Sequence, residues 1–302
     1  MKKSALITVF LTTLLVASFS VKGQTVQRMD PPNWWIDHPL DTVEILLQGE
    51  GLLKWAAQVE KPVGKVLQTT HYGDRYSLVK LWIRSGFNDD GFNITLGSKD
   101  FFFPLLERSG HQPQGLSDQD LVYLITPDRF HNGDPSNDGV PGMRERGVDR
   151  SEPYARHGGD LQGIQMGLDY IESLGATALW LNPVLENDMM RDSYHGYAIT
   201  DHYRVDPRYG GDDALRELAT ELHQREMKHI MDIVYNHWGV EHYLHRNLPD
   251  SGMVHFNPDG SIPYSNFRFS ALPIRMLWRR INRPLSTVGL RERCPILIKR
   301  IR

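Results

Sequence analysis

The sequence is nearly free of cysteine. Of its 302 residues only Cys294 is a cysteine, which excludes an intramolecular disulfide and a cysteine metal cluster. It also lacks a strong charge of either sign, because the formal net charge is −3. A nucleic-acid partner is therefore not expected. The chain has neither a G-x-G-x-x-G motif nor a phosphate-loop lysine, so its glycine-rich segments give no sign of a nucleotide site.

The N-terminal apolar run is short. Ala5–Phe19 is mostly apolar, follows Lys2 and Lys3, and is too short to span a bilayer comfortably. Small residues near Gly23 offer a cleavage site, so residues 1–23 are predicted to be a secretory signal. We then expect a periplasmic or secreted protein with no membrane partner after cleavage. An uncleaved anchor helix is the alternative.

Residues 24–115 alternate short apolar segments with turn residues. Val43–Leu47, Tyr76–Arg84 and Phe92–Leu96 are strand candidates, and no helical period runs through them. This pattern predicts a small, immunoglobulin-like β-sandwich. Pro31–Trp35 would either expose an aromatic platform for sugar or, as we prefer, pack its tryptophans against the sandwich.

After a polar linker at Gly110–Asp120, the pattern changes to alternating strands and helices. The expected elements are strand Leu121–Ile125, helix Leu161–Leu174, strand Ala176–Leu181, helix Asp212–Met227 and strand His229–Tyr235. Such an alternation predicts parallel βα units. Three units are visible where a TIM (β/α)8 barrel has eight. Residues 116–267 are therefore predicted to form the first part of an incomplete barrel.

Polar motifs follow each expected strand. Asn132–Gly139 holds four Asn and Asp side chains within seven residues. Calcium favours such oxygen ligands, but an ordinary solvated turn has the same composition. Tyr194–Tyr197 (Y-H-G-Y) follows the second strand, and its aromatic rings suit either sugar stacking or simple packing. Asn236 and His237 follow the third strand, where α/β folds place their chemistry.

Taken together, these motifs resemble the α-amylase family, glycoside hydrolase family 13, from about Val26 to Phe269. The similarity is to its neopullulanase and cyclomaltodextrinase branch, especially the starch-utilisation neopullulanases of Bacteroidetes. Each motif alone is weak, but seven occur in family order. They are Pro31–Trp35, Tyr123–Phe130, Asn132–Gly139, His157–Gly163, Tyr194–Tyr197, Asp206–Gly210 and Asp232–His237.

The resemblance implies an α-glucan ligand and a set of site residues. Tyr197 would stack on a glucose ring, His237 and His195 would hydrogen-bond it, and Asp232 and Asn236 would brace the site from behind. Calcium would be the cofactor. Its implied ligands are Asn132, Asp134, Asn137, Asp138, the Gly158 carbonyl and Asp160. The family reaction is retaining hydrolysis by two carboxyl groups, and relatives are often dimers, although the oligomeric state here is left open.

The sequence departs from the family pattern where the catalytic carboxylates should be. No G-x-R-x-D motif is present, and Gly289–Arg293 imitates it with arginine in place of aspartate. We therefore expect no nucleophile, no acid/base and no third carboxylate, hence a chain without hydrolytic activity. The alternatives are a non-catalytic α-glucan-binding protein and a pseudogene product without a folded role.

Residues 268–302 do not continue the βα pattern. They contain ten Lys or Arg and one acid, Glu292. We interpret them as an aberrant tail that follows a shift of reading frame near Leu272. A basic disordered tail, or a patch for nucleic acid or membrane, is the alternative.

Overall fold

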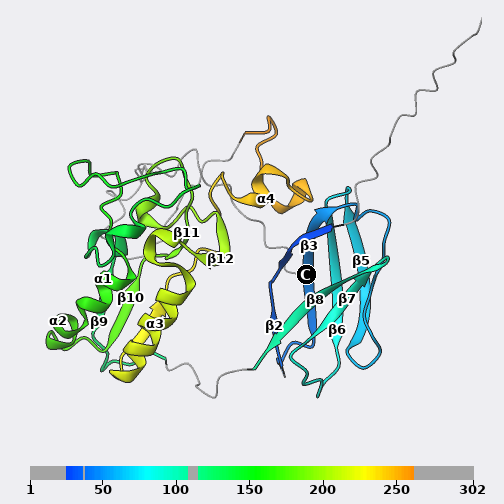
Figure 1. Ribbon diagram of the computed structural model, residues 1–302, viewed down its shortest axis with the longest axis horizontal. Helices are drawn as coiled ribbons and strands as arrows, with labels where there is room; N and C mark the ends of the chain where they lie inside the picture. The colour runs from blue at the N-terminus through cyan, green and yellow to red at the C-terminus, as the bar shows by residue number, and fades with distance from the viewer. Residues whose placement is uncertain (1–24, 37, 108–114, 262–302) are drawn as a thin grey trace, which may run out of the picture. The chain divides into compact units, whose positions relative to one another are not determined.

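The structure is a computed structural model that describes residues 25–36, 38–107 and 115–261 (Figure 1). It divides into two compact units, Met1–Leu106 and Glu107–Arg302. The predicted signal segment, part of the predicted linker, the tail and Cys294 lie outside the described residues. Within those residues, no helix has the length and apolar character needed to cross a membrane.

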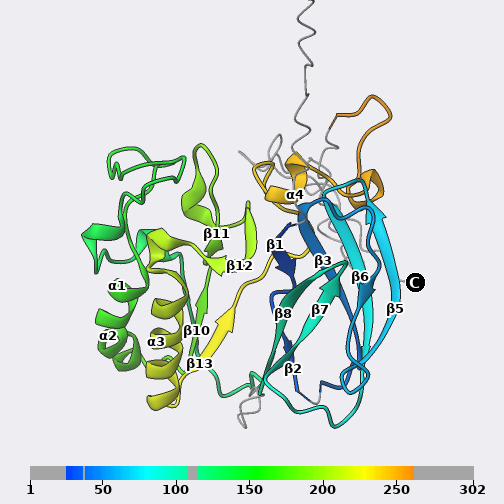
Figure 2. The same cartoon turned by 45° about the vertical axis from the view of Figure 1, so that its right-hand side comes forward.

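The first unit contains two four-stranded sheets (Figure 2). One sheet has the order β1 (Thr25–Asp30), β3 (Thr42–Glu50), β6 (Tyr76–Ile83), β5 (Gly64–Tyr72), and is antiparallel throughout. The other has the order β2 (Trp34–Trp35), β8 (Lys99–Leu106), β7 (Gly91–Leu96), β4 (Ala57–Gln58), with β2 parallel to β8. The three predicted strands match β3, β6 and β7.

A single apolar core joins the two sheets. Ile45 and Leu81 of one sheet and Ile94 and Phe103 of the other are fully buried in it. This burial follows from the alternation of side chains along each strand. Trp34 packs against the same core, as the packing interpretation of Pro31–Trp35 expects. Trp35, its neighbour in β2, is exposed.

The second unit is built on a parallel sheet of order β13, β10, β9. Its strands are β9 (Val122–Ile125), β10 (Ala178–Leu181) and β13 (Lys228–Met231). The register aligns Leu124 with Trp180 and Trp180 with Ile230. Parallel pairing of the three expected strands is therefore confirmed.

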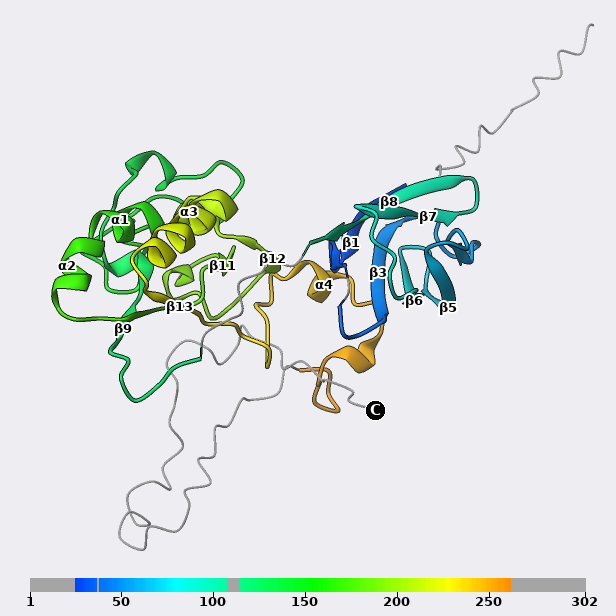
Figure 3. The same ribbon diagram turned by 90° about the horizontal axis from the view of Figure 1, so that it is seen from below.

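Three helices pack on one face of this sheet. They are α1 (Leu161–Met166), α2 (Leu168–Ser173) and α3 (Gly211–Gln224). Their buried residues, such as Ile164, Ile171 and Leu218, share one cluster with Leu179 and Leu181 of β10. Figure 3 shows α1 and α3 side by side. Burial of an amphipathic helix face against a sheet is the stabilising feature here.

Two predicted boundaries were wrong. The single helix expected over Leu161–Leu174 is broken at Gly167, where a Cβ atom would lie 2.6 Å from the Phe130 ring. The third strand ends at Met231 rather than Tyr235, because its partner β10 ends at Leu181 in the same register. Asp232 therefore follows the strand instead of lying inside it.

Short elements complete the loops. A small antiparallel hairpin, β11 (Leu185–Glu186) with β12 (Asp201–Val205), was not predicted. The remaining elements are η1 (Pro127–Arg129), η2 (Pro135–Asn137), η3 (Ser193–His195), η4 (Pro207–Tyr209), α4 (Tyr243–Arg246) and η5 (Ser251–Met253).

Candidate functional site

The predicted site residues lie in loops that follow the three parallel strands. Asn132–Gly139 comes after β9, Tyr194–Tyr197 after β10 and Asp232–His237 after β13. Adjacent parallel strands bring their carboxyl ends to one edge of the sheet. The three loops therefore lie at the same edge of the sheet.

Tyr197 joins two of these loops. Its hydroxyl donates a hydrogen bond to Oδ2 of Asp232 at 2.9 Å. Nε2 of His237 donates to the Tyr197 carbonyl at 3.0 Å, which assigns the Nε2–H tautomer. The Tyr197 amide donates to Nδ1 of His195 at 2.9 Å, and the two rings stack with centroids 6.0 Å apart. Three residues predicted from sequence, His195, Asp232 and His237, thus contact Tyr197 directly.

Asn236 lies at the periphery of this group. Its side chain is exposed, and Nδ2 lies 3.4 Å from Nδ1 of His237. At that distance the contact is at the limit of a hydrogen bond. Nδ1 of His237 is therefore the ring nitrogen with the weaker partner.

Burial controls the charge of the site. Burial and the neighbouring Asp232 raise the pKa of Tyr197 to about 12. Its phenol is therefore protonated at neutral pH and remains a donor. Burial also lowers the pKa of His237, and the hydrogen bond to Tyr197 only partly opposes this. Since both side chains are neutral, Asp232 supplies the negative charge of the group.

Asp160 organises the loop after β9. It is fully buried and caps α1, with Oδ1 accepting from the Gly163 amide at 2.6 Å and from the Gly133 amide at 3.0 Å. Oδ2 accepts from the Asp134 amide at 2.8 Å and from Nδ2 of Asn137 at 3.1 Å. A carboxylate has about four lone-pair sites. Protein donors therefore occupy the lone-pair sites of Asp160. What Asp160 still contributes to the loop is its negative charge.

The same loop leaves oxygen atoms without partners. Oδ1 of Asn132 and Oδ1 of Asn137 are buried and accept no hydrogen bond. Their amide nitrogens are already used, since Nδ2 of Asn132 donates to Asp138 at 2.8 Å. A Cβ atom at Gly158 would lie 2.4 Å from Oδ1 of Asp138, so the Gly158 backbone also approaches this loop closely.

These orphaned oxygens fit a hard cation. Buried amide oxygens without donors are costly, and calcium accepts amide, carbonyl and carboxylate oxygens together. In the described part of the chain, no three Asp, Glu, His or Cys side chains form a ready metal cluster. A cation would therefore depend on the two asparagines as well as the carboxylates, and calcium ligation stays a prediction.

A buried ion pair behind the site was missed by the sequence analysis. Asp206 and Arg208 are both fully buried and pair at 2.7 Å. Burial alone would raise the pKa of Asp206, but the Arg208 guanidinium lowers it below its usual value. Arg208 also donates to the carbonyls of Glu145 at 3.1 Å and Asn187 at 2.9 Å. The motif D-P-R-Y-G at Asp206–Gly210 was recognised in the sequence. Its contacts with the loops that contain Glu145 and Asn187 could not be read from it.

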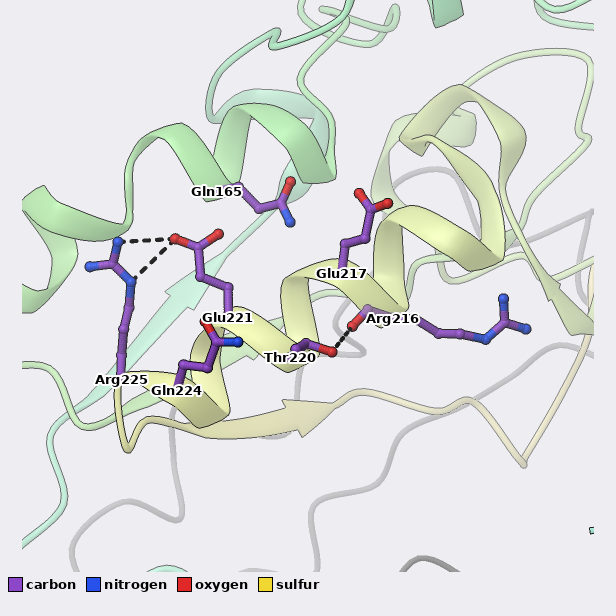
Figure 4. Close-up of a pocket in the computed structure, with 7 residues that line it drawn as sticks. All are labelled: Gln165, Arg216, Glu217, Thr220, Glu221, Gln224 and Arg225. Atoms are coloured by element: carbon purple, nitrogen blue, oxygen red, sulfur yellow. Dashed lines mark hydrogen bonds and ion pairs between the residues drawn. The ribbon is translucent and has the colours of Figure 1, made fainter. Parts of the chain in front are cut away.

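Two surface hollows lie apart from the Tyr197 group. A hollow of about 640 Å³ lies on the exposed side of α1 and α3 and holds none of the predicted residues (Figure 4). It is lined by Gln165, Arg216, Glu217, Thr220, Glu221, Gln224 and Arg225. A second hollow of about 190 Å³ adjoins the oxygen-rich loop through Asn132. Neither hollow includes Tyr197, His195, Asp232 or His237.

Family models match both units. The model described as "Alpha amylase, catalytic domain" matches residues 124–267. The model described as "Cyclomaltodextrinase, N-terminal" matches residues 28–109.

Individual relatives agree with these matches. The chain is 36% identical over 157 residues to a cyclomaltodextrinase of Thermoanaerobacter pseudethanolicus, covering 52% of this chain and 25% of the relative. It is 38% identical over 133 residues to neopullulanase 2 of Thermoactinomyces vulgaris, covering 44% and 22%. A crystal structure of an Anoxybacillus α-amylase shares 38% identity with a TM-score of 0.43, covering 51% of this chain and 30% of that one. The chain thus spans a quarter or less of these two curated relatives.

Proposed function

Because the chain belongs to the α-amylase family, in its cyclomaltodextrinase and neopullulanase branch, we propose that it carries the glucan-recognising first part of a glycoside hydrolase. The ligand is an α-glucan: starch, pullulan, a maltooligosaccharide or a cyclodextrin. The observation that carries the proposal is Tyr197 at the carboxyl edge of the sheet, where its hydroxyl donates to Asp232 and its backbone carbonyl accepts from His237.

Tyr197 is pre-organised for a sugar ring. Its side chain is only partly buried, and the hydrogen bond to Asp232 fixes the direction of the phenol. An aromatic face can stack on the apolar face of a glucose ring, and a ring fixed before binding loses less entropy on binding. His195 stacks beside it, and Nδ1 of His237 can accept a sugar hydroxyl in place of Asn236.

The residues around Tyr197 do not include the pair of carboxyl groups that hydrolysis needs. A retaining glycosidase needs two carboxyl groups about 5 Å apart across the scissile bond. Asp232 is one carboxylate, and it is already bonded to Tyr197. The 302 residues contain no G-x-R-x-D motif that would provide the family nucleophile. We therefore assign glucan binding without turnover to this chain by itself.

Calcium is the proposed cofactor of the loop after β9. Its ligands would be Asn132, Asp134, Asn137, Asp138 and the Gly158 carbonyl, and the orphaned amide oxygens of Asn132 and Asn137 support this assignment. Asp160, whose oxygens already accept four protein hydrogen bonds, would contribute its charge and not a ligand atom. When bound, calcium would neutralise the loop carboxylates and cross-link the loop. Export to the periplasm or cell exterior through residues 1–23 belongs to the same proposal.

Calorimetric titration of maltoheptaose into the chain tests the binding proposal. The wild type should bind, and Tyr197→Ala should weaken binding by at least roughly tenfold, because a buried aromatic contact contributes about 1.5 kcal/mol or more. Tyr170→Ala is the matched control, since Tyr170 is an exposed tyrosine of α2. Absence of binding in the wild type, or equal loss in both variants, would overturn the proposal.

A further inference from the structure

Glu145 makes contacts that the proposed function does not use. Oε2 of Glu145 accepts a hydrogen bond from the Ser193 amide at 2.8 Å, across 48 residues of sequence. Its own carbonyl accepts from Nη1 of the buried Arg208 at 3.1 Å. Glu145 therefore connects the Asp206–Arg208 ion pair to the segment that carries Tyr194, His195 and Tyr197.

The Ser193 amide needs such an acceptor. Ser193 is the first residue of η3, so no earlier carbonyl of the helix reaches its amide. The preceding Asp192 stands at the usual capping position but makes no side-chain capping bond. Since Ser193 is fully buried, water is not a ready substitute. The distant Glu145 carboxylate fills the capping role.

The segment also carries conformational strain. Asp192 has φ 58° and Gly196 has φ 81°, so left-handed residues stand at both ends of η3. Such a conformation is sparsely populated for a residue other than glycine and persists only when the surroundings hold it. At Gly196 a Cβ atom would lie 2.0 Å from the Pro183 carbonyl oxygen. Packing thus fixes the end of η3, whereas Glu145 fixes its start.

Buried hydrogen bonds complete the support. Nδ2 of Asn187 donates to the Ser193 carbonyl at 3.0 Å, and the Tyr209 hydroxyl donates to the Tyr194 carbonyl at 3.0 Å. Arg208 holds Asn187 in turn through its carbonyl at 2.9 Å. Among these groups, Glu145 supplies a charged acceptor at the start of the segment, where Asn187 and Tyr209 supply neutral donors. Charge-assisted bonds are about twice as strong as neutral ones.

We propose that Glu145 is a positioning residue, whose carboxylate sets the conformation of Ser193–Tyr197 in which Tyr197 meets an α-glucan. This inference rests on the proposed function, because it assigns how that same site is pre-organised. The role proposed for Glu145 is to hold this segment and not to bind the sugar. Its side chain is only partly buried and lies outside the apolar cores, so its loss should alter the site more than the stability of the fold.

Two variants separate positioning from bulk structure. Glu145→Ala removes the acceptor, whereas Glu145→Gln keeps an oxygen that can accept from the Ser193 amide. Glu217→Ala is the matched control, because Glu217 is an exposed glutamate of α3 that lines the hollow in Figure 4. For each chain we would measure maltoheptaose affinity by calorimetry, Ser193 amide hydrogen exchange by NMR, and the melting temperature.

The expected pattern is specific. Glu145→Ala should bind maltoheptaose roughly tenfold more weakly and exchange the Ser193 amide proton faster, with a melting temperature close to that of the wild type. Glu145→Gln should restore most of the affinity and the protection, and Glu217→Ala should match the wild type. Unchanged Ser193 exchange in Glu145→Ala overturns the inference, even if no sugar binds. A wild type that binds no glucan while Ser193 protection depends on Glu145 would instead refute the proposed function alone.

Discussion

The hydroxyl of Tyr197 donates a 2.9 Å hydrogen bond to Oδ2 of Asp232. The first residue follows β10 and the second follows β13, so this bond ties the loops of two adjacent parallel strands. It fixes an aromatic ring at the edge where parallel α/β folds bind ligands. The proposed glucan site depends on this pairing.

Alkaline titration should detect the Tyr197–Asp232 bond. The folded pKa of Tyr197, about 12, lies above its ordinary value of 10.0. The corresponding stability is present below pH 10 and is lost as the pH rises towards 12. The difference in ultraviolet phenolate absorbance between the wild type and Tyr197→Phe should show a step near pH 12. Burial is the larger cause of the raised pKa and the bond to Asp232 the smaller one, so in Asp232→Ala the step should move only part of the way towards 10. A step that stays in place would mean that the bond does not contribute.

Acid titration should detect the partly buried His237. Burial depresses its folded pKa below 6.5, so the folded state binds fewer protons than the unfolded state. The contribution to stability is present above pH 6.5 and is lost as the pH falls through the lower folded pKa. His237→Gln should therefore flatten the decline of unfolding free energy below pH 6.5. A decline of equal steepness in the wild type and His237→Gln would contradict this expectation.

Calcium should raise the melting temperature of the chain, because it would bind the folded loop and not the unfolded one. Asn132→Leu and Asp134→Ala should each abolish the calorimetric heat of calcium binding. Asp100→Ala is a suitable control, since that aspartate lies in β8 of the other unit. The assignment fails if the wild type gives no heat, or if both loop variants bind as well as the control.

Asp160 should matter for stability even without metal. It accepts four hydrogen bonds while fully buried and caps α1. Asp160→Ala leaves these donors unpaired and should lower the unfolding free energy by about 3 kcal/mol. Urea denaturation in the presence of a chelator measures the change. A loss below roughly 1 kcal/mol would mean that water replaces the carboxylate.

Sequence reasoning located the framework of the site because that part depends on local patterns. The apolar runs at Leu121–Ile125, Ala176–Leu181 and His229–Tyr235 gave three parallel strands, and the polar motifs after the second and third of them contact each other. Strand length was less predictable. β13 ends where its pairing with β10 ends, at Met231 opposite Leu181, and the apolar run itself does not contain that information.

Contacts across long sequence separations could not be predicted. Glu145 meets Ser193 and Arg208 across 48 and 63 residues, and no periodicity encodes such a pairing. The partners of the carboxylates around the loop Asn132–Gly139 could not be predicted either. Asp160 looks like a metal ligand in the sequence, but in the structure its oxygens accept hydrogen bonds from four protein donors.

Saturation-transfer difference NMR on maltoheptaose tests the central claim most directly, because one sample reports both binding and cleavage. With the wild-type chain, we predict transfer to the sugar ring protons, its loss in Tyr197→Ala, and no new reducing-end signals over hours. Absence of transfer from the folded wild type, or new reducing ends that accumulate above the protein-free blank, would contradict glucan binding without turnover.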